Sequence, residues 1–299
     1  MAASSLSVDE LRRAMRQGEL DLVYQPQVDL RTGHIAAVEA LVRWHRPDRR
    51  VILPSEFIPL AESSGTIGEL TDHVLDTALS QAARWTSARW DRAALPIWVN
   101  ISAAELDDAS RVDRIQRLIE NAGVRPQQLG FEVTESAPIA DLGRAVESLQ
   151  QLRGLGARIA LDDFGTGYSS LSHLRSLPAD VVKIDGSFVQ GITQSDADVA
   201  IVRAVVEMAQ ATRRVVVAEG VEDRAQQEAL DQLGCDLGQG YLFSSPQPPH
   251  CVDILLDADR QLASRPARRL QPTVRLPRPR AVSGQRGEAA IELEVRPQA

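Results

Sequence analysis

Two adjacent carboxylates, Asp162 and Asp163, end an apolar run and open a glycine-broken loop within residues 158–171. Side chains alternate between the two faces of a strand, so both can address one centre only if the strand ends there and the chain turns. Gly165 and Gly167 permit such a turn. Neighbouring carboxylates repel unless a cation neutralises them, and Mg²⁺ or Mn²⁺ prefers oxygen ligands. The pair therefore predicts a divalent-metal site, with a surface turn or a helix cap as the structural alternative.

Lysine usage singles out one further residue. Lys183 is the only lysine among the 33 basic residues, the others being arginine. A site that keeps lysine against this bias needs a compact ammonium whose pKa can move, which the planar guanidinium of arginine does not supply. We expect a functional role for Lys183, with chance survival as the alternative.

Polar residues also stand at or near the ends of the other apolar runs. On the run 36–44, Glu39 and Arg43 share a face at two-residue spacing, as a structural ion pair or as a metal ligand with a phosphate clamp. Over the whole chain the strand-end residues are Glu39, Asn100, Glu132, Asp162 with Asp163, Lys183, Glu219 and Gln239.

The elements that carry these residues alternate regularly between strand and helix. The strands are expected over residues 20–26, 36–44, 96–102, 129–135, 158–163, 180–185, 214–220 and 235–243. The helices are expected over residues 7–16, 54–62, 69–87, 110–122, 141–155, 169–177, 195–212 and 223–233. Such alternation predicts an α/β protein with βα units around a parallel sheet, and about eight strands in about 250 residues predict a TIM-like (β/α)8 barrel. In that fold the active site lies at the C-terminal ends of the strands, where these polar residues stand.

Composition limits the remaining possibilities. No run of about 18 apolar residues occurs and residues 1–7 lack a targeting pattern, so we expect no transmembrane segment and a cytoplasmic location. Cys235 and Cys251 are too few for a disulfide framework. The formal net charge of −8 argues against DNA as the main partner.

The basic residues are uneven along the chain, and the C-terminal 40 residues carry nine Arg and three Glu. We expect residues 1–259 to form the single barrel domain and residues 260–299 to be an Arg- and Pro-rich disordered tail. Contact of this tail with an anionic membrane is a lesser alternative.

These residues together resemble the EAL-domain family of cyclic-di-GMP phosphodiesterases. The resemblance covers about residues 20–249 and rests on the order and spacing of eight motifs. They are Tyr24-Gln25-Pro26, Glu39-Ala40-Leu41-Val42-Arg43, Val99-Asn100-Ile101-Ser102, Glu132-Val133-Thr134-Glu135, Asp162-Asp163-Phe164-Gly165-Thr166-Gly167, Lys183-Ile184-Asp185, Ala218-Glu219-Gly220-Val221-Glu222 and Gln239-Gly240-Tyr241.

The resemblance implies a role for each matching residue. Two divalent cations, Mg²⁺ or Mn²⁺, would be held by Glu39, Asn100, Glu132 and Asp162 and, with Asp162 bridging, by Asp163 and Glu219. Lys183 would orient or help deprotonate the attacking water, with Glu219 as the other candidate base. The residues implied at the nucleotide are Arg43, as a phosphate clamp, and Gln25, Leu41, Glu222 and Gln239. Glu135 would anchor the loop 163–170, which in the family joins homodimer formation to metal occupancy.

The sequence departs from the family pattern at Gly186 and Ser245, where basic residues are common. Neither change removes an implied metal ligand, so we expect an enzyme that hydrolyses cyclic-di-GMP to linear pGpG. The alternatives are a cyclic-di-GMP receptor without hydrolysis and a metal-dependent barrel enzyme acting on another phosphate ester.

Overall fold

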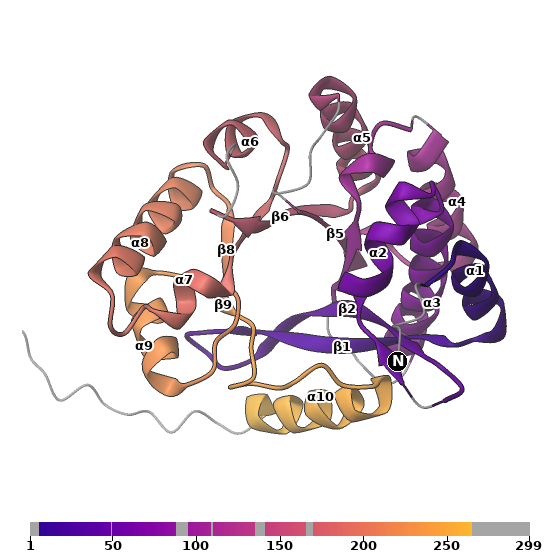
Figure 1. Cartoon of the computed structure of the whole chain (residues 1–299). Helices are drawn as coiled ribbons and strands as arrows, with labels where there is room; N and C mark the ends of the chain where they lie inside the picture. The colour runs from indigo at the N-terminus through magenta and orange to yellow at the C-terminus, as the bar shows by residue number, and fades with distance from the viewer. Residues whose placement is uncertain are drawn as a thin grey trace, which may run out of the picture. The chain divides into compact units, whose positions relative to one another are not determined.

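The strands of the chain close into a barrel surrounded by helices (Figure 1). The computed structural model describes residues 6–48, 50–87, 95–108, 110–134, 141–165 and 170–264. Within these residues, eight strands form the ring in the order β1-β9-β8-β7-β6-β5-β4-β2, closed by pairing of β1 with β2, and β3 extends the sheet beyond β2. The sequence prediction of a TIM-like barrel is confirmed.

The first two strands are long, with 10 and 11 residues, and helices follow most of the later ones. The strands are β1 (Leu20–Asp29), β2 (Ile35–His45), β3 (Val51–Ile52), β4 (Ile97–Ile101), β5 (Leu129–Thr134), β6 (Arg158–Phe164), β7 (Val181–Ile184), β8 (Val215–Ala218) and β9 (Leu237–Gly238). The α-helices are α1 (Val8–Gln17), α2 (Pro54–Ser63), α3 (Ile67–Ser87), α4 (Ser110–Ala122), α5 (Leu142–Leu155), α6 (Ser170–Ser176), α7 (Gly186–Gln190), α8 (Asp196–Ala211), α9 (Arg224–Leu233) and α10 (Pro249–Ser264). Two 3-10 helices, η1 (Ala103–Glu105) and η2 (Pro126–Gln128), complete the described elements.

One strand runs against the expected direction. β1 pairs antiparallel with both β2 and β9, whereas the pairs from β2 through β4 to β9 are parallel. A short turn between residues 29 and 35 joins β1 to β2, and such a turn can connect only antiparallel strands, because parallel strands need a longer crossover. The expectation of βα units throughout was therefore wrong for the first strand.

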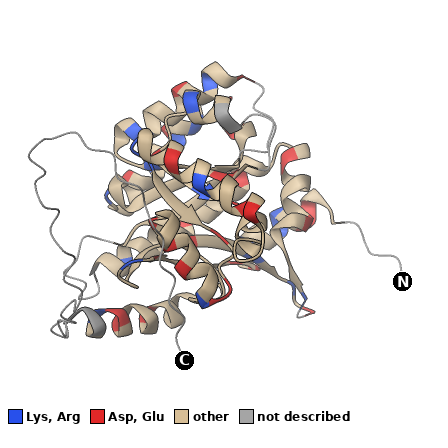
Figure 2. Ribbon diagram, turned by 90° about the vertical axis from the view of Figure 1, so that its left-hand side faces the viewer, with Lys and Arg blue, Asp and Glu red and all other residues tan. Residues whose placement is uncertain are grey.

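The helices pack on the outer face of the barrel through buried apolar side chains. Tyr24 of β1 meets Trp85 of α3 edge to face at 5.1 Å, and Trp44 of β2 meets Phe57 of α2 at 5.9 Å. Such aromatic contacts add directional packing energy to the burial of apolar area. In the view of Figure 2, acidic and basic residues are interspersed over the helices.

The last described helix, α10, was not expected from the sequence. It packs against β1, buries Val252 and Leu256, and accepts a 2.6 Å hydrogen bond from the Trp85 indole on Asp253. The helix crosses the boundary expected at residue 259, and the rest of the expected disordered tail, residues 265–299, lies outside the described residues. No described helix has the length and apolar character needed to cross a membrane.

Candidate active site

An apolar floor inside the barrel supports the polar site. Its side chains form a separate buried cluster made of Ala37, Trp98, Ala160, Val181 and Val217, with Leu237 packed against it. Each of these residues stands two positions before a site residue, which lies on the same strand or directly follows it: Glu39, Asn100, Asp162, Lys183, Glu219 and Gln239. Residues two apart on a strand share a face, so the floor and the site are successive layers of the barrel interior.

Close packing holds the floor in place at β5. Gly130 stands two positions before Glu132, and a Cβ atom at Gly130 would lie 2.1 Å from Cε3 of Trp98. The indole therefore occupies the space that any other residue at position 130 would need.

Lys183 lies at the centre of the polar layer and is 1% exposed. Its Nζ lies 2.6 Å from Oε1 of Glu219, 2.8 Å from Oε2 of Glu132 and 2.9 Å from Oδ1 of Asp162. A longer contact of 3.6 Å reaches Oε2 of Glu39. One ammonium thus faces four carboxyl groups, and this imbalance favours a further cation.

Amide side chains fix the orientation of Glu39. Asn100 donates from Nδ2 to Oε1 of Glu39 at 2.9 Å, and Gln239 donates from Nε2 to Oε2 at 2.6 Å. Gln25 Oε1 lies 3.2 Å from the same Gln239 nitrogen. Gln27, which the sequence analysis missed, donates to Oε1 of Gln239 at 3.0 Å. Its position two residues after Gln25 on an apolar strand was the available signal.

The two adjacent aspartates reach one centre because the strand is distorted between them. The pairing of β6 with β7 changes register between Leu161 and Phe164, and Asp163 has a φ of +54°, in the left-handed region. Oxygen atoms of Asp162, Asp163 and Glu219 consequently lie within 4.8 Å of one another.

β6 extends to Phe164, one residue beyond the strand end expected at Asp163, and the left-handed backbone of Asp163 lies inside it. Gly165 contributes a φ of +105°, and a Cβ atom there would lie 2.8 Å from the Phe188 ring. Gly167 lies outside the described residues.

Burial and mutual repulsion shift the pKa values of the site. Burial, followed by the charge of Asp162, raises the pKa of Asp163 to about 6. Burial raises the pKa of Glu219 to about 8, with Asp162 and Glu39 adding to the effect and Lys183 opposing it. Burial, followed by Glu39, raises the pKa of Glu132 well above its usual value. Carboxyl groups with raised pKa values retain protons in the absence of a stronger cation.

Lys183 and Glu39 are instead stabilised in their charged forms. Burial lowers the pKa of Lys183, but the surrounding carboxylates outweigh it and raise the pKa well above its usual value. Burial also opposes ionisation of Glu39, yet Lys183 and Gln239 hold its pKa below the usual value. Lys183 and Glu39 are thus both charged at neutral pH.

The donor set suits a hard divalent ion. Among the described residues, Oε1 of Glu132 is buried without a hydrogen-bond partner, although Oε2 of the same carboxylate accepts from Lys183. The clustered oxygens of Asp162, Asp163 and Glu219 offer further ligands of the type that Mg²⁺ and Mn²⁺ prefer.

A cavity of about 330 Å³ opens above these groups. Four residues implied at the nucleotide line it, namely Gln25, Leu41, Glu222 and Gln239. The exposed Tyr241, for which the motifs implied no role, lines it as well. A second, mainly apolar cavity of about 310 Å³ shares Leu41 and Asp162 with it and lies between the barrel mouth, α2 and α3.

One implied residue is placed differently. Arg43 does not line the 330 Å³ cavity, and its guanidinium donates from Nη1 to the carbonyl of Val42 at 2.8 Å. Glu135, the expected loop anchor, lies outside the described residues, as do residues 166–169 of its loop.

The comparisons with known proteins agree with this geometry. A model of the EAL domain matches residues 8–246. The cyclic di-GMP phosphodiesterase NbdA of Pseudomonas aeruginosa is 42% identical over 262 residues, which cover 88% of this chain and 33% of that protein. The bifunctional diguanylate cyclase/cyclic di-GMP phosphodiesterase MucR of the same organism is 40% identical over 242 residues, covering 80% of this chain and 35% of that protein. The chain thus spans about a third of the length of these curated relatives.

Solved structures resemble the barrel closely. The PaMucR phosphodiesterase in complex with c-di-GMP has a TM-score of 0.76 and 40% identity, covering 82% of this chain and 98% of that one. An EAL domain protein from Listeria monocytogenes has a TM-score of 0.75 and 31% identity, covering 86% of this chain and 100% of that one.

Proposed function

Since this chain belongs to the EAL domain family, we propose that it is a metal-dependent phosphodiesterase that hydrolyses cyclic-di-GMP to linear pGpG. The observation that carries the proposal is the set of carboxyl groups around Lys183 at the barrel mouth, next to a cavity open to a ligand. The similarity to NbdA, and to a MucR structure that holds c-di-GMP, supports cyclic-di-GMP as the substrate.

Two divalent cations, Mg²⁺ or Mn²⁺, complete the proposed site. The first would be held by Glu39, Asn100, Glu132 and Asp162, and the second by Asp162, Asp163 and Glu219. The free Oε1 of Glu132 and the clustered oxygens of the second group support this assignment. When bound, such cations neutralise charge on a phosphodiester and lower the pKa of water.

Lys183 and Glu219 divide the proton handling in this proposal. The raised pKa of Lys183 keeps it a hydrogen-bond donor at neutral pH. Glu219, in its ionised form, is the carboxylate beside it that can take up a proton. Glu219 accepts a proton from the attacking water. Lys183, whose Nζ lies 2.6 Å from Oε1 of Glu219, orients this water. The water oxygen bonds to phosphorus, the bond from phosphorus to the 3′ oxygen breaks, and that oxygen takes up a proton. The product carries its phosphate on the 5′ oxygen, as in pGpG.

The cavity residues bind and orient the dinucleotide in this proposal. Gln25 and Gln239 present amide groups, Glu222 an acceptor for base or ribose donors, and Leu41 an apolar surface. Arg43 would reach a phosphate only after its guanidinium leaves the Val42 carbonyl. The homodimer, the anchoring role of Glu135 and the cytoplasmic location stay predictions.

A chromatographic time course with cyclic-di-GMP tests the function. Purified protein should form pGpG with Mg²⁺ or Mn²⁺ and none with a chelator. Binding of cyclic-di-GMP without product at any metal concentration would replace the enzyme with a receptor. Hydrolysis of a generic phosphate ester, with no response to cyclic dinucleotides, would point to a different barrel enzyme.

A further inference from the structure

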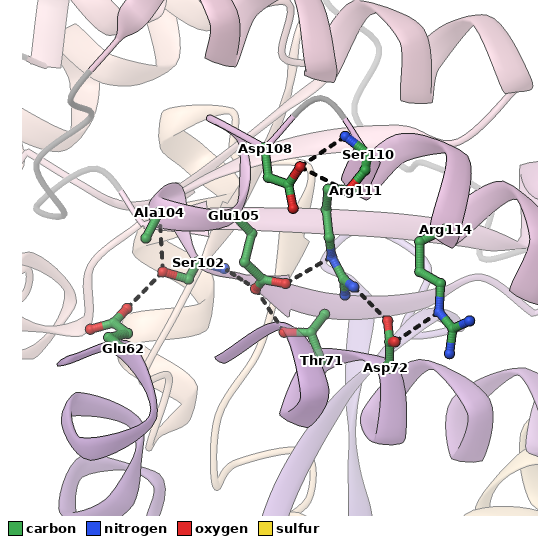
Figure 3. A network of polar contacts seen from close by, with 10 residues as sticks. All are labelled: Glu62, Thr71, Asp72, Ser102, Ala104, Glu105, Asp108, Ser110, Arg111 and Arg114. Atoms are coloured by element: carbon green, nitrogen blue, oxygen red, sulfur yellow. Dashed lines mark hydrogen bonds and ion pairs between the residues drawn. The ribbon is translucent and has the colours of Figure 1, made fainter. Parts of the chain in front are cut away.

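A network of polar and charged side chains with a buried ion pair lies beside the site, between the end of β4 and helices α3 and α4 (Figure 3). Its centre is Glu105, the last residue of η1, which is 4% exposed. Neither the family resemblance nor the proposed chemistry uses this residue.

Glu105 binds three groups from three parts of the fold. Its Oε2 accepts from the Thr71 hydroxyl of α3 at 2.7 Å and from the Ser102 backbone N–H at 3.2 Å. Its Oε1 lies 2.8 Å from Nε of Arg111 on α4. The carboxylate therefore ties the exit of β4 to the two helices outside it.

Arg111, the partner of Glu105 in this ion pair, is itself held by further contacts. Nη1 of Arg111 lies 2.5 Å from Oδ1 of Asp72, and Nε of Arg114 lies 2.9 Å from the other oxygen of that carboxylate. Removing one member of a buried ion pair leaves an uncompensated charge, so the members of such a network hold one another in place.

Ser102 transmits this constraint to the site. It stands two residues after Asn100, and its hydroxyl donates to Oε1 of Glu62 at 2.7 Å (Figure 3). Asn100 is the one exposed residue of β4, so side-chain packing alone does not hold it. Its amide nevertheless has a defined partner, Oε1 of Glu39.

We infer that Glu105 is a positioning residue, which fixes the β4 exit through the Ser102 N–H and thereby orients Asn100 toward the metal ligands. The inference rests on the proposed metal-dependent function. Partners that orient metal ligands from outside typically change metal affinity by about 10- to 100-fold when removed.

Calorimetric titration of the full chain with Mn²⁺, without substrate, tests this role. Glu105→Gln keeps the shape of the side chain and removes its charge, so affinity should fall about tenfold. Asn100→Ala should lower the affinity for Mn²⁺ by at least as much. The affinity of the double variant for Mn²⁺ should lie within about threefold of the affinity of Asn100→Ala, because Glu105 acts through Asn100.

Two further variants separate positioning from folding. Thr71→Val removes one hydrogen bond to Glu105 and should weaken Mn²⁺ binding by about threefold, even if Glu105→Gln folds poorly. Arg153→Gln breaks an ordered ion pair with Asp180, 2.7 Å long and away from β4, and should leave the affinity unchanged.

Wild-type affinity in Glu105→Gln, or losses that multiply in the double variant, would overturn the positioning role while the proposed function stands. A wild-type chain that binds no Mn²⁺ would instead overturn the proposed function and this inference with it.

Discussion

Nζ of Lys183 lies 2.6 Å from Oε1 of Glu219, the shortest of the four ion pairs that the described residues give this ammonium. The lysine comes from β7 and the glutamate directly follows β8, which pairs with β7. Neighbouring parallel strands therefore deliver the acid and the ammonium to the same edge of the barrel.

Lys183→Arg should lower kcat by about 10²- to 10⁴-fold, the range typical of a positioned proton-handling group. The replacement keeps the charge, but a planar guanidinium cannot reproduce the compact contacts of a buried ammonium. Steady-state turnover of cyclic-di-GMP measures the loss, and binding of cyclic-di-GMP in Ca²⁺ should survive. Near-normal turnover by this variant would remove the argument made from the single lysine.

Asp162→Asn should abolish both Mn²⁺ binding at the second position and turnover. The residue contacts Lys183 and belongs to the oxygen cluster with Asp163 and Glu219, so its charge serves the whole centre. Calorimetry with Mn²⁺ should show the lost binding. Full activity in this variant would contradict the bridging role.

Metal affinity should rise with pH between about pH 5 and pH 9. Asp163 and Glu219, with pKa values of about 6 and about 8, carry protons below those values, and a bound cation must displace them. Mn²⁺ titrations at unit pH intervals measure the dependence. An affinity independent of pH over this window would show that neither carboxyl group binds the ion.

The same shifts predict how the metal-free protein responds to pH. A carboxyl group whose pKa is raised by folding binds more protons in the folded state, so its contribution to stability falls as pH rises from its unfolded value to its folded value. For Asp163 and Glu219 that window runs from about pH 4 to about pH 8.

Chelated protein should accordingly unfold at a lower temperature at pH 8 than at pH 6, and Mn²⁺ should restore part of the difference at pH 8. Thermal melts followed by circular dichroism measure both effects. Glu219→Gln should reduce the difference between pH 6 and pH 8, because its pKa of about 8 places its window there. An undiminished difference in that variant would assign it to other groups.

Gly130→Ala should lower the free energy of unfolding by about 1–3 kcal/mol, because the new Cβ atom would overlap the Trp98 ring. Gly154→Ala is the matched control, since that glycine lies in α5 with no atom within 4 Å of its Cβ position. The control should be neutral or slightly stabilising. Urea denaturation measures both, and equal stability of the two variants would show that the floor can repack.

Much of the fold followed from local patterns in the sequence. Alternation of strands and helices predicted the barrel, and the polar residues at the strand ends predicted a site at the C-terminal edge of the barrel. Helix starts followed from capping side chains: Ser195 and Asp223, expected as first helical residues, are the N-caps of α8 and α9.

Features set by distant partners could not be predicted in the same way. The pairing of β1 with β9 closes the barrel and is not encoded by propensity, although the short turn before β2 already implied antiparallel pairing of β1 with β2. Helix α10 is held by Val252 and Leu256, which pack on the barrel. Because the helix runs into the Arg-rich segment, the spacing of these apolar residues did not lead to a predicted helix. Likewise, the left-handed backbone of Asp163 reflects a register shift between β6 and β7.

The most direct test of the central claim is hydrolysis of cyclic-di-GMP in ¹⁸O-labelled water, with mass spectrometry of the product. We predict that the wild-type chain forms pGpG with one ¹⁸O atom in its terminal phosphate when Mg²⁺ or Mn²⁺ is present. A chelator, or the Asp162→Asn variant, should give no product. Cyclic-di-GMP that stays intact while bound to wild-type protein in either metal would contradict the proposed function.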